Sequence, residues 1–232
     1  MTDQSLDRRD LLAGAALLGA TTLAAGAKAQ APAPKAVSFT PKPLPFDPTK
    51  ISFLSEKLLT SHHDNNYTGA VKRLGAIETT IAGLDVAAAQ GFTLNGLKRE
   101  ELIAWNSMIL HEIYFDGLGE PSKPGARLAS ALERDFGSMD RWTADFSSMG
   151  KALGGGSGWV VLTYSHRDGR LMNQWAADHT MSLANSTPVL VLDMFEHAYA
   201  MDYGSKAADY VNGFMKAIKW ASADAKFAKA SA

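Results

Sequence analysis

The chain has 232 residues, 46% of them hydrophobic and 20% charged, which is ordinary for a globular protein of one large or two small domains. Its formal net charge of -1 gives no reason to expect nucleic acid or an anionic membrane surface as a partner. Because it contains no cysteine, disulfides, thiolate metal sites and cysteine nucleophiles are excluded.

Residues 1–29 are typical of a twin-arginine signal peptide. Arg8 and Arg9 precede a small, apolar run over residues 13–27, and Ala-Lys-Ala at 27–29 predicts a cleavage site. The run is too short and too weakly apolar for a membrane span. We therefore expect export of the folded protein through the twin-arginine machinery to the periplasm, with no membrane attachment of the mature form. The alternative interpretation is an N-terminal helix of a cytoplasmic protein.

The next segments predict a proline-rich tail and then a pair of helices. Residues 30–50 hold most of the prolines and read as a tail. Residues 51–118 predict a helical-hairpin domain, with one helix from Ser55 to about Ala89 and a second from Leu97 to about Gly117. The glycine-containing stretch 91–96 is expected to connect them, with the helices antiparallel.

Residues 119–232 predict a C-terminal α/β domain. Helices are expected over 126–136 and 138–153, and strands over 159–164, 170–176 and 188–192. Further helices are expected around Tyr199 and over 207–220. The fold class is therefore α+β: an N-terminal antiparallel helical hairpin followed by an α/β domain with a three-stranded antiparallel sheet.

Potential metal ligands lie in three of these elements. Asp193 and His197 follow the apolar run at 188–192, and His62 and His111 lie on the two helices of the hairpin. Imidazole and carboxylate suit iron, manganese and zinc. Each residue alone has an ordinary explanation, because a single helical histidine is more often a core or surface residue and an aspartate after a strand is often a helix cap. Spacing cannot show that the four converge.

Together these segments resemble the iron/manganese superoxide dismutase family over roughly residues 44–220. The family's C-terminal motif, Asp-x-Trp-Glu-His-Ala-Tyr, stands here as DMFEHAY at 193–199. The second-helix ligand motif stands as HEIYF at 111–115, and the histidine-rich first segment as HHDNNY at 62–67. The runs ERDFGS at 133–138 and GSGW at 156–159 also look like family landmarks, in the right order.

The resemblance implies a superoxide dismutase that converts superoxide to oxygen and hydrogen peroxide. It implies one iron or manganese ion per chain, with a slight preference for iron, held by His62, His111, Asp193 and His197. It also implies a homodimer or a tetramer. In the family, the glutamate matching Glu196 reaches a ligand histidine of the partner, and we group Tyr199 with it at that interface.

Several positions depart from the usual family pattern. The family's outer hydrogen-bond donor to the metal-bound solvent matches either Ser107 or, better, His179, and we take His179 for that role, with Gln174 as its rival. The usual channel tyrosine falls at Ala70, so Tyr67, one helical turn earlier, is the candidate catalytic tyrosine. Asn66 replaces a usual histidine, and Phe195 replaces the motif's tryptophan.

These departures leave two alternatives open. One is a catalytically weakened, dimeric metal-binding homologue with a structural or metal-holding role. The other is a zinc hydrolase at the same ligands, for which only Glu196 is near enough in sequence to act as a general base.

Overall fold

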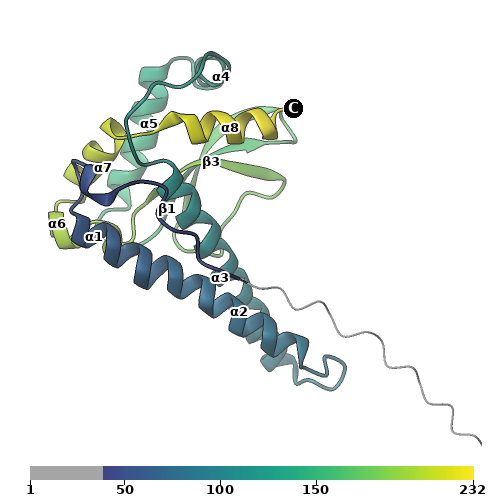
Figure 1. Ribbon diagram of the computed structural model, residues 1–232. Helices are drawn as coiled ribbons and strands as arrows, with labels where there is room; N and C mark the ends of the chain where they lie inside the picture. The colour runs from purple at the N-terminus through teal and green to yellow at the C-terminus, as the bar shows by residue number, and fades with distance from the viewer. Residues whose placement is uncertain (1–38) are drawn as a thin grey trace, which may run out of the picture. The chain divides into compact units, whose positions relative to one another are not determined.

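The computed structural model describes residues 39–232 (Figure 1). The predicted signal peptide and the first part of the proline-rich tail lie outside the described residues. After a short 3-10 turn, η1 (Pro48–Lys50), the described part follows the predicted α+β class. Among its helices, none combines the length and the apolar run that a bilayer crossing requires.

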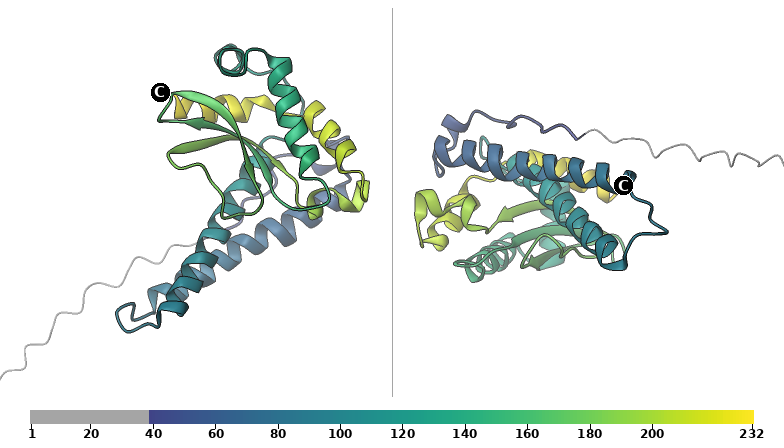
Figure 2. Two further views of the ribbon diagram at one scale, coloured as in Figure 1. Left: turned by 180° about the vertical axis from the view of Figure 1, so that it is seen from behind. Right: turned by 90° about the horizontal axis from the view of Figure 1, so that it is seen from below.

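The N-terminal half is the predicted helical hairpin. Its first helix consists of α1 (Glu56–Ser61), a π-helical segment η2 (His62–Tyr67) and α2 (Thr68–Ala82) in direct succession. The Ser55 side chain caps its start by accepting a hydrogen bond from the Leu58 amide at 3.1 Å, a contact typically worth about 1 kcal/mol. The second helix, α3 (Gly91–Asp116), packs along α2 (Figures 1 and 2).

The connection between these helices was predicted wrongly. The first helix ends at Ala82 rather than near Ala89, because after Gly83 the Asp85 side chain accepts bonds from two following amides and forms a turn. The second helix begins at Gly91 rather than at Leu97. A glycine costs only about 1 kcal/mol in a helix, so the packing of the hairpin outweighs it.

The sheet contains three antiparallel strands in the order β2-β1-β3. The strands are β1 (Trp159–Ser165), β2 (Arg170–Ala176) and β3 (Ser186–Asp193). Trp159, the first residue of the central strand, lies opposite Asp193, the last residue of β3. This register places the carboxylate at the end of the sheet beside the start of β1.

The remaining helices pack on the sheet or on one another. They are α4 (Ala126–Phe136), α5 (Met139–Ala152), α6 (Ala200–Tyr203), α7 (Ala207–Lys216) and α8 (Trp220–Ala230). The helix predicted over 207–220 ends at Lys216, and a separate helix that the sequence did not predict begins at Trp220. The break arises because the backbone at Ile218 and Lys219 pairs with Gly117 and Ser122, including a Lys219 N–H to Gly117 carbonyl bond of 2.8 Å.

Aromatic packing fixes the C-terminal half of α3 against the α/β part. Tyr114 of α3 stacks on Phe214 of α7 at 6.1 Å between ring centroids, and Phe214 stacks on Phe146 of α5 at 6.5 Å. All three side chains are buried. The hairpin is therefore held against the end of the sheet, where Asp193 lies.

Candidate metal centre

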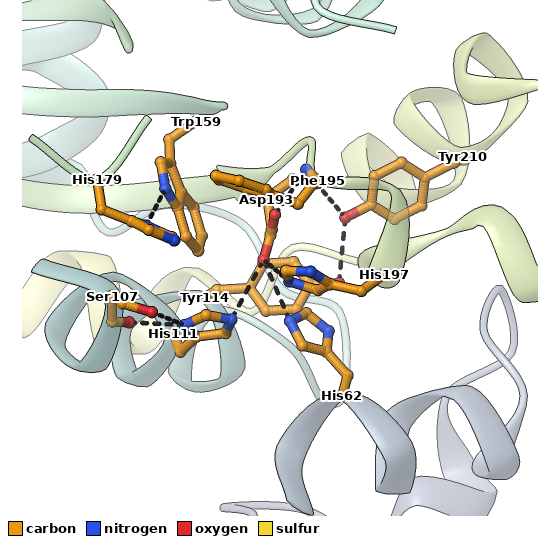
Figure 3. A network of polar contacts seen from close by, with 10 residues as sticks. All are labelled: His62, Ser107, His111, Tyr114, Trp159, His179, Asp193, Phe195, His197 and Tyr210. Atoms are coloured by element: carbon orange, nitrogen blue, oxygen red, sulfur yellow. Dashed lines mark hydrogen bonds and ion pairs between the residues drawn. The ribbon is translucent and has the colours of Figure 1, made fainter. Parts of the chain in front are cut away.

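Four side chains from four separate elements converge at the end of β3. His62 is the first residue of η2, His111 lies in α3, Asp193 ends β3, and His197 lies in the 3-10 turn η3 (Glu196–Ala198). One ligand atom from each lies within 4.8 Å of every other (Figure 3). The predicted ligand set is thus brought together by the fold.

The convergence centres on one carboxylate oxygen. Asp193 Oδ2 lies 3.1 Å from Nε2 of His62, 3.3 Å from Nε2 of His197 and 3.6 Å from Nε2 of His111. His62, His111 and Asp193 are buried, and His197 is partly buried. All three imidazoles therefore present the same nitrogen to a single point.

The chemistry of this donor set fits a metal ion. Nε2 of His111 and of His197 are buried and have no hydrogen-bond partner among the described residues, although both face the carboxylate. Buried polar atoms are normally paired, so two orphaned nitrogens at one point call for an electron-pair acceptor. Three nitrogens and one oxygen with a position left open suit iron or manganese.

Hydrogen bonds to the ligand atoms that face away from the centre fix the orientation of His111 and Asp193. His111 Nδ1 donates to the carbonyl of Ser107, one helical turn earlier, at 2.6 Å, which leaves Nε2 as the atom with a free lone pair. Asp193 Oδ1 accepts from the amide of Phe195 at 2.9 Å, so Oδ2 is left for the centre. The Tyr210 hydroxyl donates to the Asp193 carbonyl at 2.8 Å and also contacts the Tyr114 hydroxyl.

Burial keeps the imidazoles of His62 and His111 neutral. It lowers the pKa of His111 to about 3 and lowers the pKa of His62, despite the nearby carboxylate. For Asp193, burial alone would raise the pKa, but attraction to the imidazoles of His197 and His62 and the His62 hydrogen bond outweigh it and hold the pKa below its usual range. At neutral pH the site therefore offers neutral His62 and His111 and an ionised carboxylate, the protonation states that bind metal.

His179 lies at the edge of the centre. Its Nδ1 accepts a hydrogen bond from the Trp159 indole at 3.0 Å, and its ring stacks on Phe195 at 4.7 Å. The ring centroid is 6.4 Å from that of His111. Since Nδ1 acts as an acceptor, the neutral ring carries its proton on Nε2, which is then a free donor.

The rival donor Gln174 is engaged elsewhere. Its amide nitrogen donates to the Met181 carbonyl at 3.2 Å, and its oxygen accepts from the Leu183 amide at 2.9 Å. Both ends of this side chain therefore hold the loop after β2.

In the described part of the chain, the other predicted functional residues make no hydrogen bond to the four ligands. The Tyr67 hydroxyl contacts Glu112 and the backbone of Lys42, so these contacts give its predicted catalytic part no support. Glu196 is exposed, and Tyr199 is buried with its hydroxyl accepting from the Gly155 amide at 3.3 Å. Their predicted part in a subunit contact stays a prediction.

A polar cavity of about 330 Å³ adjoins the centre. Ser107 and His179 line it, and its remaining lining residues are Asn65, Asn66, Gly69, Ala70, Arg73, Ile103 and Ala104. The sequence analysis did not predict that Arg73 lines this cavity or that Trp159 bonds to His179. No sequence signal indicates either feature, because each depends on segments that meet only in the folded chain.

Comparison with known proteins gives consistent matches. The model of the family "Iron/manganese superoxide dismutases, C-terminal domain" matches residues 124–226. The protein "Superoxide dismutase [Fe]" of Cupriavidus metallidurans is 65% identical over 181 residues, covering 78% of this chain and 92% of that protein. "Superoxide dismutase [Fe]" of Sulfolobus acidocaldarius is 34% identical, covering 72% and 81%. "Superoxide dismutase [Mn] 2" of Haloferax volcanii is 30% identical, covering 76% and 88%.

Proposed function

Because this chain belongs to the iron/manganese superoxide dismutase family, we propose that it disproportionates superoxide to oxygen and hydrogen peroxide at a mononuclear centre. The observation that carries the proposal is the convergence of His62, His111, Asp193 and His197 within 4.8 Å. These four residues would hold one iron or manganese ion per chain. The relative that is 65% identical is named as an iron enzyme, which favours iron here.

The bound ion would supply one-electron oxidation of one superoxide and one-electron reduction of the next. The protein contributes charge and protons. A single carboxylate among neutral imidazoles leaves a di- or trivalent ion with net positive charge, which attracts an anionic substrate. Reduction to hydrogen peroxide consumes two protons, so the residues lining the cavity must admit water as well as superoxide.

His179 is our candidate donor to solvent at the open position of the centre. The Trp159 indole occupies its Nδ1, and the amide of Asn106 anchors its backbone carbonyl at 2.6 Å. Both contacts hold His179 in the lining of the cavity, and the indole bond leaves Nε2–H available. A donor so placed tunes the balance between water and hydroxide at the metal, and with it the reduction potential.

A weakened homologue remains the second candidate function. Ala70 and Asn66 stand where the family usually has a tyrosine and a histidine, and both line the cavity. The substrate route therefore lacks two proton-bearing groups.

Pulse radiolysis separates these two candidates. We expect iron- or manganese-loaded protein to remove superoxide catalytically, with a second-order rate above 10⁷ per molar per second, on the order of an efficient enzyme. Stoichiometric removal by fully metal-loaded protein would favour the metal-holding role instead.

We also propose export and self-association. Export is supported by the Arg8-Arg9 pair and its apolar run; replacing both arginines by lysine should keep the protein in the cytoplasm in cell fractionation. Assembly into a homodimer or tetramer is supported by exposed Glu196 beside His197. Light scattering of wild type and Glu196→Ala tests it, with a smaller mass expected for the variant.

A further inference from the structure

Lys42 contacts both helices of the hairpin through all of its polar groups. It lies in a strap, residues 39–46, that has no regular secondary structure. Pro41 and Pro43 flank Lys42 and restrict its backbone to extended conformations. In an extended chain the N–H and C=O of Lys42 point away from the chain axis and can bond to neighbouring elements. The N–H donates to the Tyr67 hydroxyl at 2.9 Å, the C=O accepts from His63 Nε2 at 2.8 Å, and the ammonium pairs with Glu112.

Tyr67 completes this set of contacts. Its side chain is only 2% exposed, and its hydroxyl donates to Glu112 Oε1 at 3.0 Å while accepting from Lys42. One hydroxyl therefore joins the strap, the first helix and α3. Removing it would take a hydrogen-bond partner from the Lys42 N–H and from the partly buried Glu112 carboxylate, which is costly.

The strap is anchored further along the hairpin by Phe39. Its ring packs edge-on against Trp105 of α3 at 5.1 Å, and it lies directly over Gly75 of α2. A side chain larger than hydrogen at position 75 would meet the Phe39 ring at 3.7 Å. The strap thus contacts both helices at two places, one at Lys42 and one at Phe39.

The residues held by Lys42 are sequence neighbours of two ligands. His63 follows His62, and Glu112 follows His111. His63 and Tyr67 also stand near the two ends of η2, whose π-helical bonding is rare in proteins and concentrated at functional sites. The strap therefore contacts the hairpin where its two ligands are presented.

From these contacts we propose that Lys42 and Tyr67 are positioning residues, which hold His62 and His111 at the separation that metal binding requires. This inference rests on the proposed metal-dependent function. It assigns Tyr67 a place behind the ligands rather than in the substrate route.

The first test measures metal release from full-length, metal-loaded protein to a chelator. Tyr67→Phe should release metal about tenfold faster than wild type, as changes behind metal ligands commonly do. Lys42→Met, which keeps the backbone bonds, should accelerate release less. Tyr203→Phe is the matched control, because it also removes a hydrogen-bonded tyrosine hydroxyl, which in this case donates to the Phe53 carbonyl at 2.6 Å. Release at the wild-type rate in Tyr67→Phe, or equal acceleration in both tyrosine variants, would overturn the inference.

A metal-free readout keeps this inference separate from the proposed function. In full-length protein without metal, Tyr67→Phe should speed amide hydrogen exchange in residues 62–67 and 111–115, and Tyr203→Phe should not. Unchanged exchange in these segments would overturn the positioning role even if the wild type binds metal. Failure of the wild type to bind metal would instead refute the proposed function, and the exchange result would still decide whether the strap holds the hairpin.

Discussion

The indole N–H of Trp159 donates a 3.0 Å hydrogen bond to Nδ1 of His179. Trp159 begins the central strand opposite Asp193, whereas His179 lies in the loop after β2. The bond therefore ties the orientation of His179 to the same strand end that carries a metal ligand, and it selects the neutral ring form with a proton on Nε2.

This relationship predicts the effect of two substitutions. His179→Ala should lower activity and shift the reduction potential while metal content stays near that of wild type, because the residue donates to solvent without binding the ion. Trp159→Phe should act in the same direction but less strongly, since it frees Nδ1 and leaves the imidazole in place. Activity, metal analysis and redox titration measure these effects.

Trp175→Phe is the control for the tryptophan variant, because Trp175 is 50% exposed on β2. Loss of metal in His179→Ala would make His179 a ligand. Unchanged activity and reduction potential in His179→Ala would show that His179 has no part in the reaction.

Substrate attraction should depend on Arg73. Its guanidinium lies in the wall of the cavity beside the centre, and that wall contains no acidic side chain, although Arg73 pairs with Glu100 outside it. Arg73→Gln should lower the second-order rate with superoxide several-fold at low ionic strength and weaken the salt dependence of that rate. Stopped-flow or pulse-radiolysis rates over a salt series would measure both effects.

The adjacent Lys72→Gln removes the same charge from an exposed position outside the cavity wall, so it serves as the control. Equal losses in the two variants would indicate an effect of overall charge and would refute a local role for Arg73.

Acid should destabilise the metal-free protein. Burial lowers the folded-state pKa of His62 and His111, the latter to about 3, whereas an unfolded histidine titrates near pH 6.5. As pH falls below about 6.5, the unfolded chain therefore takes up protons that the folded chain does not, and the free energy of unfolding decreases. The lowered pKa of Asp193 adds a further loss only below about pH 4.

Denaturant unfolding of metal-free protein between pH 8 and pH 5 would measure this loss. We expect little change above pH 7 and a progressive decrease below pH 6.5. The slope should be shallower in His111→Gln, which removes one buried imidazole. A free energy of unfolding that rises on acidification from pH 7 to pH 5 would contradict this account of the buried histidines.

The four candidate ligands were proposed from the resemblance of their motifs to a known family, since spacing alone could not show that they converge. The fold class was predictable because local sequence carries it. Ser138 caps α5 by accepting from Arg141, and Gly137 ends α4 with φ of 89°, as turn chemistry leads one to expect. The strands β1 and β2 were likewise confirmed. These features depend on residues a few positions apart.

The features that could not be predicted depend on contacts between distant segments. Gly117 and Lys219 pair across about a hundred residues of chain and split a helix that looked continuous. Tyr67 reaches Lys42 in a segment that composition marked as a proline-rich tail. Proximity in sequence to His62 suggested a catalytic tyrosine, but only the folded chain reveals which partner a long side chain meets.

Metal stoichiometry tests the central claim most directly, namely that four converging side chains bind one ion. Wild type and Asp193→Ala would be loaded anaerobically with iron and with manganese, freed of excess ion and assayed for metal per chain. The account predicts about one ion per wild-type chain and close to none in the variant, because the carboxylate oxygen at the centre of the three imidazoles is lost. No bound metal in the wild type, or equal metal in both proteins, would contradict it.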